Sequence, residues 1–197
     1  GEFPAAAMLF HRNDVSVAKR TVHIGWSEAE TFTGRPSHIQ APRSPFRHYT
    51  WLSKVRNAFF KEAYGGKAEL VRGATWQPAV HKRYVSDTGE LALDSDRGLF
   101  TIDTPRTKAV IGHLGGLGGK VELESLSVEC TTPFAAILVT SLDGEPIGKA
   151  ERVLVTAVAR AENTGQAYYR NHTSVPERGR LPVLCEPVNA TLTLAMP

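Results

Sequence analysis

The alternation of apolar and polar residues is clearest in the second half of the chain, where it predicts β-strands. Residues 98–104 and 190–196 alternate with a period of two, as half-buried strands do. Residues 120–130 also alternate, but the apolar positions change phase midway. We therefore expect a bulge or bend near Ser125.

A short and continuous apolar run covers residues 134–142 and predicts a central strand that is buried on both faces. The Asp143-Gly144 dipeptide follows it and favours a hairpin, with residues 152–161 as the returning strand. Turn signals recur about every ten residues, a rhythm typical of antiparallel sandwiches and barrels.

The first half of the chain is less regular. Residues 5–12 and 21–26 resemble strands. The best helix candidate is the stretch 49–66, in which we expect one short helix near residues 50–63, because apolar side chains recur there at helical spacing. These side chains are Trp51, Val55, Ala58 and Phe59.

Two further segments complete the predicted fold. Residues 30–49 carry three prolines and no apolar period, so they are expected to form a loop. Residues 81–94 predict a hairpin that turns at residues 87–89. The fold class is therefore mainly β: an antiparallel β-sandwich of about eight to ten strands with one short helix. We expect a single domain over residues 1–197, with a sub-boundary near residues 94–98 as the alternative.

Composition and net charge make some classes of function less favoured than others. The chain has 197 residues, 42% of them hydrophobic and 22% charged, which is ordinary for a globular protein. The formal net charge of +3 is small and the basic residues are scattered, so no nucleic-acid partner is expected. No apolar run approaches the ~18 residues of a membrane span, and no signal-peptide pattern is present.

The glycine-rich segment 115–119 resembles a phosphate-binding loop only superficially. A Walker loop requires serine or threonine after the lysine, but Val121 follows Lys120. Leu114 stands where the first glycine should be. Since the segment that follows predicts a strand rather than a helix, we interpret these glycines as a turn between two strands.

Other catalytic and metal motifs are weak. Residues 16–19 match S-x-x-K, but without the further motif elements of acylating serine enzymes. The seven histidines include no pair at the i, i+4 spacing of a helical metal site. No cofactor is expected; a structural calcium ion near residues 93–98 is the alternative, without a D-x-D-x-D-G loop to support it. Cys130 and Cys185 are expected to be buried free thiols, with a disulfide between them as the alternative.

The aromatic residues carry the strongest binding hypothesis. Sugar rings present apolar C–H faces on which aromatic side chains stack, while polar neighbours supply hydrogen bonds. The alternative is that these side chains pack the core or its rim, with Trp51 holding the predicted helix on a sheet. The candidate carbohydrate-binding residues are Trp26, Trp51, Trp76, Tyr168 and Tyr169.

Four segments, spread over most of the chain, resemble a known family. Residues 3–15, 98–116, 139–165 and 182–194 are similar to the region that follows the catalytic barrel in some large bacterial glycoside hydrolases. In those enzymes the region resembles a β-sandwich packed against a (β/α)₈ barrel, which carries the two catalytic carboxylates. A barrel needs ~250 residues, so it is not part of this sequence and no catalytic residue is carried over.

The resemblance implies a non-catalytic carbohydrate-binding or accessory module of a polysaccharide-degrading enzyme. Its partners would be a polysaccharide or oligosaccharide and the catalytic barrel domain of the parent enzyme. An extracellular or periplasmic location follows from the resemblance alone. Two alternatives stay open: a purely structural domain that supports the barrel, and a small independent glycan hydrolase with an unrecognised acidic pair.

Overall fold

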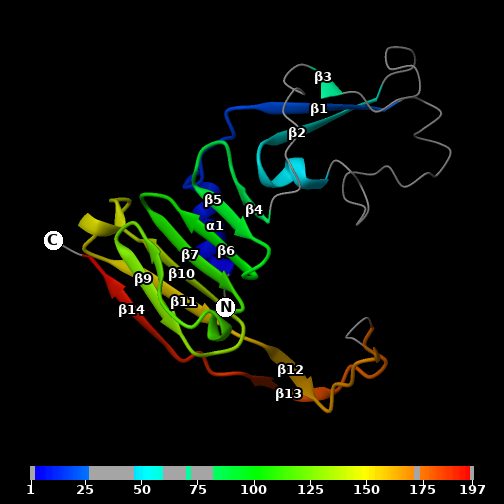
Figure 1. Ribbon diagram of the computed structural model, residues 1–197. Coiled ribbons are helices and arrows are strands. Elements are labelled where there is room, and N and C mark those ends of the chain that lie inside the picture. Colours follow the sequence, from blue (N-terminus) through cyan, green and yellow to red (C-terminus); the bar gives the residue numbers. More distant parts are fainter. Residues whose placement is uncertain (1–2, 27–46, 60–69, 72–81, 171–173, 196–197) are drawn as a thin grey trace. The chain divides into compact units, whose positions relative to one another are not determined.

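The computed structural model describes residues 3–26, 47–59, 70–71, 82–170 and 174–195 (Figure 1). The chain divides into two compact units. Unit 2 is residues 15–96, and unit 1 consists of residues 1–14 together with residues 97–197. Unit 1 is therefore discontinuous in sequence, with unit 2 inserted between its two stretches. The expectation of one domain over the whole chain stays a prediction.

Unit 1 is mainly β, which confirms the predicted fold class. Its largest sheet is antiparallel and contains the strands predicted at 98–104, 134–142 and 152–161. The strand order in this part of the sheet is β11-β10-β7-β6. The strands are β6 (Leu99–Asp103), β7 (Thr107–Gly112), β10 (Ala135–Ser141) and β11 (Val153–Val158).

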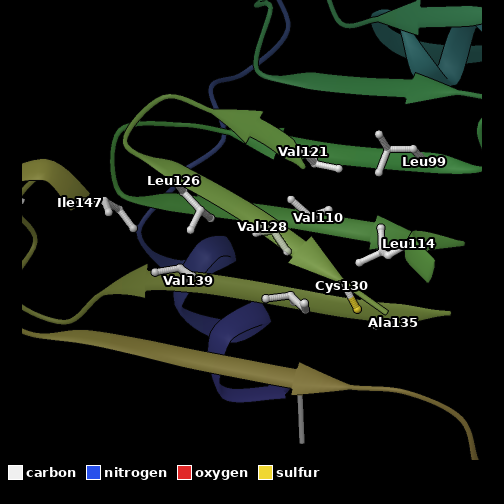
Figure 2. Packing of buried hydrophobic residues seen from close by; sticks show 11 residues of the cluster. Leu99, Val110, Leu114, Val121, Leu126, Val128, Cys130, Ala135, Val139 and Ile147 are labelled. Atoms are coloured by element: carbon white, nitrogen blue, oxygen red, sulfur yellow. The ribbon is translucent and has the colours of Figure 1, made fainter. Parts of the chain in front are cut away.

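A second antiparallel sheet has the order β14-β9-β8 and includes the predicted C-terminal strand. Its strands are β8 (Val121–Leu123), β9 (Leu126–Cys130) and β14 (Ala190–Leu194). Buried residues of both sheets share one hydrophobic cluster (Figure 2). Val110 and Val139 come from the first sheet, and Leu126 and Val128 from the second.

Strand β10 shows why the apolar run has no polar face. Ile137 and Val139 belong to the cluster shared by the two sheets. Ala136 and Leu138 point to the opposite face and form a second cluster with Ala5. Because successive side chains of a strand point to opposite faces, a strand covered on both sides is apolar throughout. The prediction of a doubly buried central strand is confirmed.

Ala5 lies on the helix α1 (Phe3–His11), and this corrects the strand predicted at residues 5–12. The segment contains three consecutive alanines, and alanine has the highest helix propensity. Of the bulge or bend expected near Ser125, the structure shows the bend, in the form of a turn. Ser125 has a φ of 60° and lies in the tight turn between β8 and β9, which pair Leu123 with Leu126. The segment forms two antiparallel strands rather than one bulged strand.

Unit 2 contains a three-stranded sheet of mixed direction. Strand β1 (Thr21–Trp26) lies between β2 (Lys54–Phe59), to which it is parallel, and β3 (Leu70–Val71), to which it is antiparallel. The strand predicted at 21–26 is confirmed. The purely antiparallel pairing that we expected does not hold here.

The helix predicted near residues 50–63 is wrong. A short 3-10 helix, η1 (Arg47–Trp51), is followed by strand β2, and residues 60–69 lie outside the described residues. The register aligns Val55 with Val22. Pairing with a strand that is distant in sequence thus outweighs the helical preference that the local apolar spacing indicates. The loop predicted at 30–49 lies largely outside the described residues.

The hairpin predicted at 81–94 is confirmed as β4 (Arg83–Val85) and β5 (Leu91–Asp94), which pair antiparallel. Unit 1 contains a further hairpin, β12 (Ala161–Thr164) and β13 (Arg180–Cys185). All residues of β13 are exposed.

Two short 3-10 helices, η2 (Leu114–Gly116) and η3 (Ile147–Lys149), lie in connections of unit 1. Within the described ranges no helix is long and apolar enough to cross a membrane.

Candidate functional site

The predicted aromatic residues fall in different parts of the molecule. Trp51 is the last residue of η1 in unit 2, and 39% of its side chain is exposed. Trp26 ends strand β1, but its side chain lies outside what the structure describes, as does the whole of Trp76. These three tryptophans all belong to the sequence of unit 2.

The two predicted tyrosines belong to unit 1, in the connection between β12 and β13. Tyr168 is half-buried, and its hydroxyl accepts a hydrogen bond of 2.6 Å from the Gln166 amide. Tyr169 is 60% exposed, and its backbone N–H donates to the carbonyl of Ser174 at 2.8 Å. The candidate residues are therefore divided between two units.

Trp51 lines a cavity of about 80 Å³ that is formed by residues of unit 2. Its apolar wall includes Val15, Leu52 and Leu91. Five residues that carry a hydroxyl group and one aspartate also line the cavity. These are Ser16, Thr50, Ser53, Ser86, Thr88 and Asp87. Trp51 together with this cavity, whose lining includes five residues that carry a hydroxyl group, is the candidate site.

The turn between β4 and β5 supplies one side of the cavity. The Ser86 N–H donates to the Leu91 carbonyl at 2.8 Å, and the Leu91 N–H donates to the Ser86 hydroxyl at 3.1 Å. Gly89 closes this turn with a φ of 81°, a conformation that favours glycine. The hydrogen bonds fix Asp87 and Thr88 at the tip of the hairpin.

The segment that follows η1 supplies the opposite side of the cavity. The N–H groups of Leu52 and Ser53 both donate to the carbonyl of Tyr49, at 3.1 and 3.0 Å. Tyr49 is buried, and this burial raises the pKa of its phenol. The Leu52 carbonyl accepts a hydrogen bond of 2.9 Å from the Asp87 N–H, which joins the two sides of the cavity.

The carboxylate of Asp87 is only partly satisfied. Its Oδ2 accepts a hydrogen bond of 2.6 Å from the Arg20 N–H. Its Oδ1 is buried and has no hydrogen-bond partner, and the same is true of the Ser53 hydroxyl. Buried polar atoms without partners are uncommon in folded proteins. Both atoms belong to residues that line the cavity.

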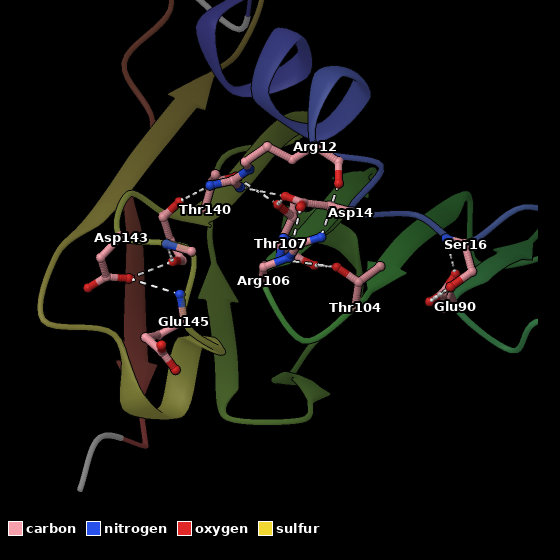
Figure 3. Close-up of polar contacts among 12 residues, drawn as sticks. Arg12, Asp14, Ser16, Glu90, Thr104, Arg106, Thr107, Thr140, Asp143 and Glu145 are labelled. Atoms are coloured by element: carbon pink, nitrogen blue, oxygen red, sulfur yellow. Dashed lines mark hydrogen bonds and ion pairs between the residues drawn. The ribbon is translucent and has the colours of Figure 1, made fainter.

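Ser16 is held at the cavity by the carboxylate of Glu90. Its N–H donates to Oε2 and its hydroxyl donates to Oε1, each at 2.7 Å (Figure 3). Because both carboxylate oxygens of Glu90 are used in this way, Glu90 acts as a support for Ser16. Among the described residues that line the cavity, Asp87 is the acidic one.

No metal site emerges from the described residues, which contain no cluster of three or more histidine, cysteine, aspartate or glutamate side chains that could hold an ion. In the segment considered for calcium, Asp96 instead forms an exposed ion pair with Lys82 at 2.6 Å.

Cys130 and Cys185 are both free. Cys130 is buried as expected, whereas Cys185 is exposed, which corrects its predicted burial.

Sequence reasoning found part of this cavity. It identified Trp51, and it predicted the turn that carries Asp87 and Thr88. Ser53 was missed because a single serine within a predicted helix carries no local signal. Only the pairing of distant segments brings it to the same cavity as Asp87.

Comparison with known proteins adds no assignment. No protein-family model, no curated protein and no solved structure matches this chain.

Proposed function

We propose that this chain is an accessory module of a polysaccharide-degrading glycoside hydrolase and that its unit 2 binds glycan at the Trp51 cavity. The observation that carries the proposal is the partly exposed Trp51 ring at the wall of a hydroxyl-rich cavity. The resemblance of the sequence to the region that follows a catalytic barrel gives the biological setting.

The chemistry of the cavity suits a sugar. An aromatic face attracts the apolar C–H face of a pyranose, and hydroxyl and carboxylate side chains form directional hydrogen bonds with sugar hydroxyls. Ser16 and Thr50 are exposed, so they can reach a ligand at the surface.

The size of the cavity defines how the sugar would bind. Pockets that enclose a drug-sized ligand occupy ~300–1,000 Å³. A cavity of about 80 Å³ is too small for a sugar ring, but it can hold a small substituent. We therefore place the ring against Trp51 and one substituent inside the cavity.

Binding of this kind would act through effective concentration. A module that holds a polymer near the catalytic barrel raises the local substrate concentration without new chemistry. The polysaccharide and the catalytic barrel domain are thus the two proposed partners, and the location is proposed to be extracellular or periplasmic.

Affinity electrophoresis of the full chain in gels that contain soluble neutral polysaccharides tests this proposal. We expect the wild type to be retarded and Trp51→Ala to lose most of the retardation while its melting temperature changes little. Tyr169→Ala is the matched control, because it removes another exposed aromatic side chain from unit 1. Loss of retardation in Tyr169→Ala but not in Trp51→Ala would contradict the cavity as the binding site.

A purely structural role is the second candidate, and the exposed hairpin of unit 1 favours it. Leu181 and Leu184 of β13 are 79% and 57% exposed, and Val183 lies between them on the same strand. Two-stranded hairpins are marginally stable alone, and exposed apolar patches often mark contacts with a partner. This candidate predicts no retardation in any polysaccharide gel. The independent hydrolase, in contrast, predicts turnover by this chain alone.

A further inference from the structure

Resting on the proposed function, we infer that residues 15–20 form a displaceable wall of the Trp51 cavity and that the carboxylate of Glu90 latches this wall in place. We call residues 15–20 the strap. Release of the strap opens the cavity to a whole sugar ring. The inference concerns how access to the proposed glycan site is controlled.

Three segments of unit 2 form the cavity, and two of them are joined to each other through the backbone. The turn between β4 and β5 and the segment that follows η1 share the hydrogen bond from the Asp87 N–H to the Leu52 carbonyl, at 2.9 Å. The strap is the third segment, and it contributes Val15, Ser16 and Ala18 to the lining. The cavity therefore has two sides that hold each other and one that is attached separately.

The attachment of the strap depends on two carboxylates of the β4–β5 turn. The two oxygens of Glu90 accept hydrogen bonds from the N–H and the hydroxyl of Ser16, each at 2.7 Å (Figure 3). Oδ2 of Asp87 accepts a hydrogen bond of 2.6 Å from the Arg20 N–H. Within the described part of the chain, no backbone–backbone hydrogen bond joins residues 15–19 to another segment. Side chains of the turn thus hold the strap.

The strap is exposed to solvent along most of its length. Ser16 and Lys19 are exposed, and Val17 is 72% exposed. Segments that bury little apolar surface and rely on solvent-exposed hydrogen bonds open at a small part of the free energy of global unfolding. The strap ends at Arg20, whose carbonyl accepts a hydrogen bond of 3.1 Å from the Lys54 N–H. Opening frees the N–H groups of the strap and leaves this last bond in place.

Displacement of the strap changes what the cavity can hold. The closed cavity of about 80 Å³ takes one small substituent of a sugar. In the open form Trp51 and the β4–β5 turn remain, but the strap no longer bounds the space between them and solvent. A sugar ring binds this form better than the closed one, so ligand binding and strap opening favour each other.

Amide hydrogen exchange of the ¹⁵N-labelled full chain tests the latch without any ligand. We expect Glu90→Ala to raise the exchange rate of the Ser16 amide about tenfold and that of the Arg20 amide about threefold or more, because the strap opens as one segment. The amides of Ser86 and Leu91, which bond within the hairpin, should keep their rates. A change confined to Ser16 would overturn the inference, since Glu90 would then hold one residue and not a strap.

Asp96→Ala is the matched control, because it removes a carboxylate of unit 2 that pairs with the exposed Lys82. It should leave exchange in the strap unchanged. If it raises the Ser16 and Arg20 rates as much as Glu90→Ala does, the faster exchange reports a general loosening of unit 2 and the latch is wrong.

The link to the glycan site is tested by titration of the same chains with mannohexaose, cellohexaose and a galactan oligosaccharide. We expect Glu90→Ala to bind about threefold or more tightly than the wild type, because the closed form no longer reduces the fraction of competent molecules. If the wild type binds and Glu90→Ala opens the strap without a gain in affinity, the inference is wrong and the proposed function stands. If neither chain binds any of the three probes, the proposed function is wrong and control of glycan access falls with it.

Discussion

The hydroxyl of Thr107 donates a hydrogen bond of 2.7 Å to Oδ2 of Asp14, although 93 positions separate the two residues. Arg12 and Arg106 pair with the same carboxylate at 2.5 and 3.0 Å (Figure 3). We call Arg12, Asp14, Arg106 and Thr107 the Asp14 cluster. It ties the end of the first stretch of unit 1 to strand β7, at the point where the chain leaves for unit 2.

The first prediction concerns this cluster. The Asp14 side chain is fully buried, and its removal takes away a carboxylate that two arginines and a buried hydroxyl share. We expect Asp14→Ala to lower the free energy of unfolding of unit 1 by about 2–4 kcal/mol, because breaking a buried ion pair is costly and both arginines here are partly exposed. Urea denaturation followed by circular dichroism measures the change.

Asp96→Ala is the control for that measurement. Asp96 pairs with Lys82, and both side chains are exposed, so the loss should stay below about 1 kcal/mol. Equal losses in the two variants would contradict a stabilising role for the Asp14 cluster.

The glycines of η2 give a second prediction. A Cβ at Gly115 would lie 2.6 Å from the Thr131 carbonyl oxygen and 2.9 Å from that of Thr132, whereas a Cβ at Gly116 meets nothing within 4 Å. Gly115→Ala should therefore destabilise unit 1 by about 1–3 kcal/mol. Gly116→Ala should leave thermal stability unchanged or slightly raised. Equal stability of the two variants would contradict the close approach of the backbone at Gly115.

The third prediction is a pH dependence. Hydrogen bonds from the Ser141 hydroxyl, and then from the N–H groups of Glu145, Glu151 and Arg152, lower the pKa of Asp143 from 3.8 to about 2. Since this pKa is lower in the folded state than in the unfolded one, its stabilising contribution is complete above about pH 4 and is lost as the pH falls toward 2.

Carboxyl ¹³C resonances measure this titration directly. We expect the Asp143 carboxyl to titrate with a midpoint near 2 in the native chain. The stability difference between the wild type and Asp143→Asn should be constant at neutral pH and disappear in the same acidic interval. A midpoint near 4 would mean that the N–H groups do not hold the carboxylate in solution.

The fourth prediction separates the two thiols. Cys185 is exposed on β13, whereas Cys130 is buried on β9 and its thiol points to the Thr132 carbonyl oxygen at 3.8 Å. Iodoacetamide should label one cysteine rapidly in the native chain and both in urea. Cys185→Ser should abolish the rapid reaction. Rapid labelling that persists in this variant would contradict the burial of Cys130.

Strand β10 illustrates what the sequence could predict. A short apolar run has few alternatives to a doubly covered strand, and residues 134–142 behave accordingly. The Asp143-Gly144 signal predicted the pairing of β10 with β11 correctly. It did not predict the connection, because Asp143 binds N–H groups as far along as Arg152 and the turn becomes a long loop that includes η3.

The helix predicted near residues 50–63 illustrates the opposite case. Trp51 and Val55 have helical spacing, but Val55 pairs with Val22 in a parallel strand arrangement. Parallel pairing is a long-range interaction that no local window contains. The candidate site could not be predicted from local sequence for the same reason. Ser53 and Asp87 line one cavity only because the tertiary structure brings their segments together.

The most direct test of glycan binding at the Trp51 cavity is an NMR titration of the ¹⁵N-labelled full chain with a neutral oligosaccharide, with the indole signals assigned by single Trp→Phe variants. We predict that the Trp51 indole signal and the backbone amides of Ser53, Asp87 and Thr88 shift together with one saturation curve. Shifts confined to Tyr168 and Tyr169, or no shift at millimolar oligosaccharide, would contradict it.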